Sequence, residues 1–199
     1  VSAKEKLEEL GFNVSFSSNY FEHDLFDSAS IASRVEDLHE AFLDPSVDAI
    51  LATIGGFNCN ELLPYLNYDL IAQNPKIICG YSDTTALLNA IYAKTGIQTY
   101  MGPSYSSFKM KEGQEYQSQS WLKAVTQDDY DLVPSKEWSS DPWYDPTKPR
   151  HFMPTEWKVY KAGKASGIAI GGNLSTFALL RGTPYAPQVE NYVLFVEEA

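Results

Sequence analysis

One short stretch, Gly80-Tyr81-Ser82-Asp83, constrains the fold and the chemistry of this chain more than any other. The apolar run 75–79 before it predicts a buried strand, and the run 84–88 after it predicts a helix. A serine two residues after a glycine, at a turn from strand to helix, is typical of a nucleophile elbow, which lifts the hydroxyl clear of the sheet. The alternative is structural: Ser82 is a helix N-cap, and Asp83 satisfies free N–H groups of the first turn.

Other strand and helix patterns surround this turn. The apolar run 47–54 predicts a strand that leads into Gly55-Gly56, and paired glycines at a strand end leave backbone N–H groups open to a ligand. Residues 31–43 predict an amphipathic helix, and another strand starts within 96–100. Alternating strands and helices predict a doubly wound, parallel α/β sheet with functional loops at the carboxyl ends of its strands. We therefore expect Gly55-Gly56 and Ser82 to be neighbours.

The remaining pattern divides the chain into domains. The further predicted elements are a helix over 2–10, a strand over 12–16, a helical connector over 61–72 broken by Pro64, a strand and turn over 168–172, a helix over 174–181 and a strand over 192–196. We predict an N-terminal α/β domain over 1–125, a linker or lid rich in Pro and Trp over 126–163, and the start of a C-terminal α/β domain over 164–199. A doubly wound domain usually opens on a strand before such a first helix, so we expect both ends of this sequence to fall within domains.

A series of short motifs follows in order along nearly the whole chain. They are Gly55-Gly56, Leu62-Leu63-Pro64-Tyr65-Leu66, Asn74-Pro75-Lys76, Gly80-Tyr81-Ser82-Asp83, Gly102-Pro103, Gly171-Gly172-Asn173-Leu174, Gly182-Thr183-Pro184-Tyr185 and Leu194-Phe195-Val196-Glu197-Glu198. This succession resembles the LD-carboxypeptidase family of serine peptidases and, within it, the microcin C immunity proteins. The resemblance implies a serine hydrolase without metal or cofactor that cleaves an amide bond next to a free carboxylate. That bond is either the L-to-D bond of a murein tetrapeptide or the amide joining an aminoacyl group to a nucleotide-like moiety.

The resemblance also implies roles for single residues. A serine hydroxyl needs a base to take its proton, and the base needs an orienting carboxylate. In the Ser-His-Glu triad of the family, Ser82 is the nucleophile and Glu197 the carboxylate, whereas strand alternation points Glu198 the opposite way. The backbone N–H groups of Gly56 and Asp83 are the expected oxyanion hole. The alternative for Glu197 is a solvated acid at the end of a strand.

We expect five residues to contact the substrate. They are Gly55, Asn58, Ser104, Trp138 and Trp143. The two tryptophans belong to the Pro-rich linker, whose aromatic residues are too many for a disordered tether. They form either an aromatic wall over the active site, which would suit a nucleobase, or a cover for a sheet edge or subunit contact.

The base is where this chain departs from the family pattern. Its histidines are His23, His39 and His151, and none lies in the family's histidine motif, which falls beyond Ala199. We expect His39 to be a solvated surface residue and the catalytic histidine to lie outside the 199 residues.

Net charge and cysteine content limit the classes of partner and the compartment that we expect for this protein. A net charge of −11 disfavours nucleic acid and anionic membranes as partners, and no run is long enough for a transmembrane helix. Cys59 and Cys79 lack the spacing of a metal or redox site and predict buried thiols in a reducing, cytoplasmic compartment. We further expect a homodimer acting on a small peptide or peptidyl-nucleotide. The alternative from another class is a non-catalytic α/β module that binds an anion or other ligand at Gly55-Gly56 and the following helix. A dinucleotide-binding enzyme is disfavoured because no G-x-G-x-x-G follows a strand.

Overall fold

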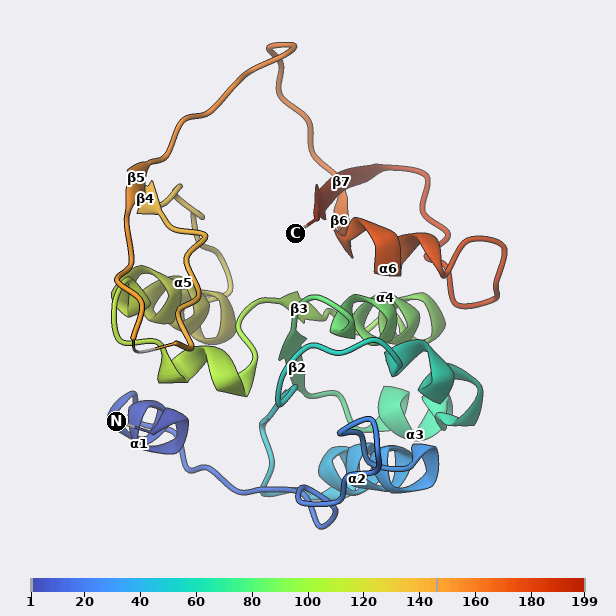
Figure 1. Cartoon of the computed structure of the whole chain (residues 1–199). Coiled ribbons are helices and arrows are strands. Elements are labelled where there is room, and N and C mark those ends of the chain that lie inside the picture. Colours follow the sequence, from blue (N-terminus) through green and yellow to red (C-terminus); the bar gives the residue numbers. More distant parts are fainter. Residues whose placement is uncertain (1, 146, 199) are drawn as a thin grey trace. The chain divides into compact units, whose positions relative to one another are not determined.

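The computed structural model describes residues 2–145 and 147–198 (Figure 1). The chain forms two compact units, one made of residues 1–13 and 105–165, the other of residues 14–104 and 166–199. Within the described residues, no helix combines the length and the apolar composition that crossing a membrane requires.

The larger unit is built on a parallel three-stranded sheet. Its strands are β1 (Ala49–Leu51), β2 (Ile77–Gly80) and β3 (Tyr100–Met101), in the order β1-β2-β3. Leu51 pairs with Cys79, and Cys79 pairs with Tyr100. The helices between and before these strands are α2 (Ile31–Leu43), the 3-10 helix η1 (Cys59–Tyr65), α3 (Tyr68–Gln73) and α4 (Thr84–Thr95). This arrangement confirms the predicted α/β class with a parallel sheet.

Helix α4 is the centre of this unit. Its residues from Thr84 to Ile91 are all buried, because the helix contacts β2 and β3 as well as η1, α3 and elements further along the chain. A helix covered on all sides needs apolar or small side chains throughout, which explains its run of Thr, Ala and Leu. Gly96 ends α4 in a left-handed conformation with a φ of 74°, as a glycine at this position commonly does.

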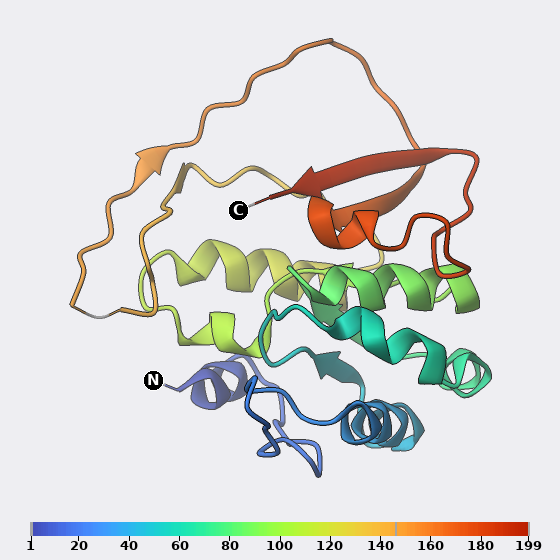
Figure 2. The same cartoon turned by 45° about the vertical axis from the view of Figure 1, so that its right-hand side comes forward.

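A second parallel pair packs on α4 in the same unit. Strands β6 (Ile168–Asn173) and β7 (Tyr192–Glu197) pair along their length, and α6 (Leu174–Ala178) follows β6 directly. Gly171 has a φ of 129°, and a Cβ there would collide with the carbonyl oxygen of Phe195 on β7. Only glycine allows the two strands to approach this closely. Figure 2 shows β6, β7 and α6 with α4 from a second direction.

The smaller unit contains α1 (Ala3–Glu9), the 3-10 helix η2 (Tyr105–Lys109), α5 (Gln114–Thr126) and the short antiparallel pair β4 (Glu137–Trp138) and β5 (Met153–Pro154). A capping box between Ser2 and Glu5 begins α1. The Trp121 ring of α5 lies 5.1 Å from the ring of Phe12 and 5.3 Å from that of Phe108, measured between ring centroids. Phe108 and Trp121 of this cluster are buried, as are Ala3 and Leu7 of α1.

One expectation about the elements was wrong. Residues 12–16 form no strand, because their alternating aromatics pack on rings instead of a neighbouring ladder: Phe12 packs on Trp121, and Phe16 lies 4.4 Å from Tyr20. The broken helical connector expected over 61–72 is present as two pieces, η1 and α3, but the break follows Tyr65, and Pro64 lies inside η1. Helix α5 was not predicted from the sequence. The division into domains at residues 125 and 163 stays a prediction.

Candidate active site

Ser82 occupies a strained turn between β2 and α4. Its φ is 58°, a left-handed conformation that a residue other than glycine adopts at a cost of about 1–3 kcal/mol. The turn is tight: a Cβ on Gly80 would lie 2.8 Å from Thr84 Cγ2 and 2.9 Å from Ala52 Cβ. The N-cap position of α4 belongs to Asp83, so the alternative in which Ser82 caps the helix is wrong. Such a strand-turn-helix geometry is that of a nucleophile elbow.

The glycine loop, residues 55–59, lies against this turn. A Cβ on Gly55 would lie 2.9 Å from Ser82 Cβ and 3.0 Å from Ser82 Oγ, and one on Gly56 would lie 3.4 Å from Asp83 Oδ2. The expected proximity of the paired glycines to Ser82 is therefore confirmed. Among the described residues, neither the Gly56 N–H nor the Asp83 N–H has a hydrogen-bond partner. The site thus offers two free backbone donors beside one serine hydroxyl.

Asp83 uses its side chain in a way that the sequence did not predict. It makes no side-chain cap to α4; instead, Oδ2 accepts a hydrogen bond of 2.8 Å from the Cys59 N–H of the glycine loop. Burial raises the pKa of the Cys59 thiol far above its usual range, and the nearby Asp83 carboxylate adds to this effect. The thiol therefore stays protonated and is not a nucleophile.

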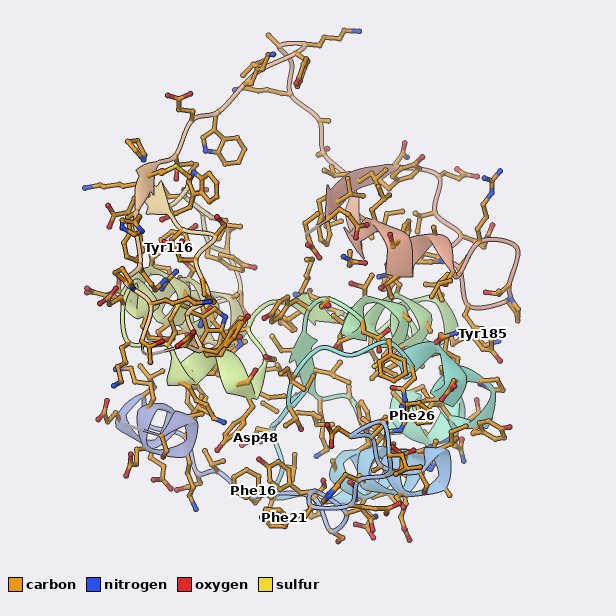
Figure 3. The ribbon with its side chains drawn as sticks, viewed as in Figure 1. Phe16, Phe21, Phe26, Asp48, Tyr116 and Tyr185 are labelled. Carbon is orange, nitrogen blue, oxygen red and sulfur yellow. The ribbon has the colours of Figure 1, made fainter. Side chains whose placement is uncertain are left out.

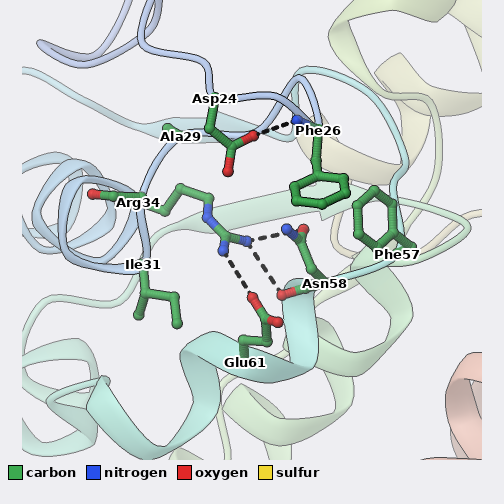
Figure 4. Close-up of a pocket in the computed structure, with 9 residues that line it drawn as sticks. Asp24, Phe26, Ala29, Ile31, Arg34, Phe57, Asn58 and Glu61 are labelled. Atoms are coloured by element: carbon green, nitrogen blue, oxygen red, sulfur yellow. Dashed lines mark hydrogen bonds and ion pairs between the residues drawn. The ribbon is translucent and has the colours of Figure 1, made fainter.

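Asn58 belongs to a pocket beside the glycine loop (Figure 4). Arg34 Nη1 donates to both Asn58 Oδ1 (3.0 Å) and the Asn58 carbonyl oxygen (3.2 Å), and Arg34 Nη2 lies 3.3 Å from Glu61 Oε2. The pocket has a volume of about 330 Å³ and is lined by Asp24, Phe26, Ala29, Ser30, Ile31, Arg34, Phe57, Asn58 and Glu61. Because the Asn58 amide also donates to Ser28 Oγ (3.0 Å), both ends of this side chain have partners within the chain.

Three exposed phenylalanines lie in the segment before α2, and one of them, Phe26, also lines this pocket. The three are Phe16, Phe21 and Phe26 (Figure 3).

Glu197 is linked to the elbow through β6. It is the last residue of β7 and pairs with Asn173, whose N–H donates to Thr85 Oγ1 (3.0 Å) in the first turn of α4. One carboxylate oxygen, Glu197 Oε1, is buried and has no hydrogen-bond partner among the described residues. Glu198 is engaged elsewhere: its carboxylate accepts hydrogen bonds from the Ser175 N–H (2.8 Å) and hydroxyl (2.7 Å), which lower its pKa.

The remaining residues expected to contact substrate are Ser104, Trp138 and Trp143. Ser104 is completely buried in the larger unit. Trp138 lies on β4 and is half exposed, and Trp143 is half-buried with its ring 6.0 Å from that of Tyr144. Both tryptophans belong to the smaller unit. Their contact with substrate, like that of Ser104, stays a prediction.

No histidine hydrogen-bonds to Ser82 or Glu197 in the described part of the chain. His23 Nδ1 lies 3.1 Å from the Phe21 carbonyl oxygen, and His151 Nδ1 lies 3.2 Å from Asp141 Oδ2. His39 is half-buried on α2, where its Nε2 accepts a hydrogen bond from the Asn67 N–H (2.9 Å), so the expectation of a solvated surface residue was wrong.

Two parts of the chain match the models of a known protein family. Residues 1–102 match the LD-carboxypeptidase N-terminal domain, and residues 166–199 match the LD-carboxypeptidase C-terminal domain. The chain belongs to the LD-carboxypeptidase family. It is 50% identical to the protein YocD of Bacillus subtilis, covering all of this chain and 62% of YocD. It is 35% identical to the microcin C7 self-immunity protein MccF of Escherichia coli, covering 98% of this chain and 60% of MccF.

Solved structures agree with the sequence comparison. The crystal structure of an MccF-like protein from Bacillus anthracis superposes with a TM-score of 0.96 at 52% identity, over 98% of this chain and 60% of that one. The chain therefore spans about 60% of the length of the relatives that it matches.

Three residues around this LD-carboxypeptidase elbow were missed by sequence reasoning. They are Arg34, Asn89 and the side chain of Asp83. Each acts on a partner far away in the sequence: Asn89 Nδ2, for example, donates to the Gly171 carbonyl oxygen (2.8 Å), 82 residues away. Of the three, Asn89 alone was marked in the sequence: it is a polar amide among the apolar or small residues that fill the buried part of α4, Thr84 to Ile91.

Proposed function

We propose that this protein is a serine hydrolase in which Ser82 attacks an amide carbonyl next to a free carboxylate. The observation that carries the proposal is the strained Ser82, pressed against Gly55 and flanked by the unpaired N–H groups of Gly56 and Asp83. A base takes the Oγ proton as Oγ attacks the carbonyl carbon, and the two N–H groups stabilise the oxyanion. The protonated base then gives its proton to the leaving amine, and water hydrolyses the acyl-enzyme. The reaction in this proposal uses no metal or cofactor.

In this proposal Glu197 orients the base. Its buried, unpaired Oε1 is suited to accept a hydrogen bond from an imidazole N–H. We place that imidazole outside residues 1–199, as the family resemblance implies. A histidine between Glu197 and Ser82 would complete a Ser-His-Glu triad.

For the substrate we propose the amide of an aminoacyl-nucleotide over the murein tetrapeptide. MccF, which is 35% identical to this chain, has been solved in complex with glutamyl sulfamoyl guanosine. The murein tetrapeptide carboxypeptidase of Pseudomonas aeruginosa is 27% identical over 157 residues. The nearer likeness to MccF supports a substrate in which a nucleobase stacks on Trp138 or Trp143. A homodimer and a cytoplasmic location stay predictions.

The nucleophile is tested by covalent labelling. A longer form of the protein, containing residues 1–199 and a downstream histidine, is treated with a serine-reactive phosphonate, and the label is mapped by mass spectrometry. We expect the label on Ser82, and we expect Ser82→Ala to lower kcat by roughly 10⁴- to 10⁶-fold. Label on another residue, or turnover that survives Ser82→Ala, would contradict the proposal. In the non-catalytic alternative, the parent shows no turnover and Ser82→Ala leaves ligand affinity intact.

The substrate class is tested by competing glutamyl sulfamoyl adenosine with a murein tetrapeptide on the same enzyme. We expect the nucleotide substrate to be preferred, and Trp138→Ala or Trp143→Ala to raise its KM while leaving that of the tetrapeptide unchanged. Preference for the tetrapeptide, unaffected by either substitution, would show that the aromatic linker does not bind substrate.

A further inference from the structure

One peptide group of the glycine loop is held between two opposite charges. The carbonyl oxygen of the Asn58–Cys59 peptide accepts from Arg34 Nη1 (3.2 Å), and its N–H donates to Asp83 Oδ2 (2.8 Å). The cation therefore faces the negative end of the peptide dipole and the carboxylate faces the positive end. Charge-assisted hydrogen bonds of this kind are stronger than neutral ones and reinforce each other through the peptide.

Both charges are withdrawn from solvent to make these contacts. Asp83 is 3% exposed, and the Arg34 side chain is 18% exposed. Burying a carboxylate is costly unless it accepts hydrogen bonds, and Asp83 does not use its oxygens to cap α4. Its Oδ2 instead accepts the Cys59 N–H of the glycine loop, 24 residues earlier in the chain.

The two charged residues come from different elements. Arg34 belongs to α2, and Asp83 follows the elbow serine directly. Tying one peptide to both elements fixes the loop relative to Ser82. The loop has little other freedom on that side, because not even a Cβ would fit between Gly55 and the Ser82 side chain: it would lie 2.9 Å from Ser82 Cβ.

We propose that Arg34 and Asp83 are positioning residues that hold the Gly56 N–H in place beside Ser82 through the Asn58–Cys59 peptide. This inference rests on the proposed function, in which Gly56 donates to the oxyanion. Such donors must match the position of the developing charge closely to stabilise it. The pairing also accounts for a carboxylate next to a site that stabilises negative charge, because Arg34 offsets that charge across the peptide.

The first test compares single substitutions in the longer form of the protein, with glutamyl sulfamoyl adenosine as substrate. Asp83→Ala removes the acceptor, and we expect kcat to fall about 10- to 100-fold while KM stays within about threefold, because a displaced donor costs less than a missing one. Asp83→Asn keeps an acceptor oxygen for the Cys59 N–H, and we expect it to recover most of the activity. If Asp83→Ala fails to fold, Arg34→Gln makes the same test from the other end of the peptide, with the same expected loss in kcat.

Two matched controls separate the peptide contacts from their surroundings. Cys59→Ala removes the thiol and keeps the N–H that Asp83 accepts. Glu61→Gln removes the ion pair with Arg34, in which Glu61 is half exposed, and keeps the Arg34 contact with the peptide. We expect both controls to keep the kcat of the parent; a loss in either as large as in Asp83→Ala would overturn the inference.

The second test asks whether Asp83 acts through Gly56. A valine at position 56 would push its methyl groups into the Asp83 carboxylate, which already lies 3.4 Å from the position of a Cβ. We expect Gly56→Val to lower kcat by about 10²-fold or more, and Asp83→Ala to add little in the double mutant. Losses that multiply would show independent roles and overturn the inference.

A readout without catalysis separates this inference from the proposed function. Hydrogen exchange at the amides of residues 56–59 should quicken in Asp83→Ala and not in Glu61→Gln. Faster exchange with an unchanged kcat would overturn the positioning role while the serine hydrolase stands. Turnover that survives Ser82→Ala would instead show that the proposed function fails, and the exchange rates would still report whether the loop is held by Asp83.

Discussion

The conformation of Ser82 depends on two glycines, Gly55 and Gly80, that have no side chain to occupy the space around it. Its left-handed backbone is tolerated because Gly80 leaves room for Thr84 and Ala52, and because Gly55 leaves room for the Ser82 side chain itself. A methyl group at either glycine would need space that is already filled. Residues in such strained conformations persist where surrounding contacts over-determine them, and they cluster at functional sites. The strain at Ser82 is thus a property of three residues, of which two are glycines.

A second residue, His39, is expected to make the stability of the protein depend on pH. Burial lowers the pKa of His39 below its usual value of 6.5, and its Nε2 can accept the Asn67 N–H only while the ring is neutral. The folded state therefore binds the proton less well than the unfolded state does. The contribution of His39 to stability is fully present above the unfolded pKa and is lost as the pH falls through the folded pKa.

We expect the melting temperature to fall between pH 7.5 and pH 5.5 by less in His39→Gln than in the parent, because a glutamine oxygen accepts the Asn67 N–H at every pH. His23→Gln is the control, since the His23 side chain is exposed. An equal pH dependence in His39→Gln and the parent would show that other groups cause it.

At the scale of elements, Asn89 joins α4 to β6. Its Nδ2 donates to the carbonyl oxygens of Thr85 and Gly171, both at 2.8 Å, and its Oδ1 accepts from the Gly171 N–H (3.4 Å). We expect Asn89→Leu to lower the free energy of unfolding by about 1–3 kcal/mol, because it leaves buried polar groups of Gly171 unpaired. Urea denaturation measures this loss. Asn60→Leu, at an exposed position, is the control and should change stability little; equal losses in the two variants would argue against the Asn89 contacts.

The sequence predicted an element correctly where residues close together in the chain determine it, and failed where packing against distant residues determines it. The helix predicted over 31–43 coincides with α2 because its limits are local: Ser30 caps its start through the Ser33 N–H, and its apolar stripe has the helical period. Helix α5 was missed because Gln114 and Ser118 are among its buried side chains, so no apolar stripe marks it. The strand expected over 12–16 is absent. Alternating aromatic residues occur both in strands that pair with a neighbouring strand and in loops whose rings pack on other aromatic rings, so the alternation alone does not distinguish the two.

Within the site, too, local features could be predicted and contacts between distant residues could not. Ser82 and the paired glycines could be predicted, because each directly follows an apolar run that indicates a strand. The contact of Asp83 with Cys59 and that of Arg34 with Asn58 could not, because each joins residues 24 positions apart and depends on how two elements pack. Acidic residues at helix starts usually cap them, so the local rule for Asp83 favoured the wrong partner.

At the scale of the molecule, the question is whether residues 1–199 alone can turn over a substrate, and we expect that they cannot. A serine hydroxyl keeps its proton at neutral pH unless a base removes it, and Glu197 cannot act on Ser82 without an imidazole between them. None of the three histidines contacts either residue in the part of the chain that the structure describes, while Glu197 Oε1 is buried there without a partner.

The measurement compares turnover of glutamyl sulfamoyl adenosine by the 199-residue chain and by a longer form that includes a downstream histidine. The short chain should show at most the residual acceleration of an oxyanion hole, roughly 10³-fold over water, and the longer form full activity. Equal turnover by the two would mean that the base lies within these 199 residues. His151 would then be the first to replace, by alanine, because its ring already contacts the Asp141 carboxylate as a catalytic imidazole contacts its orienting acid.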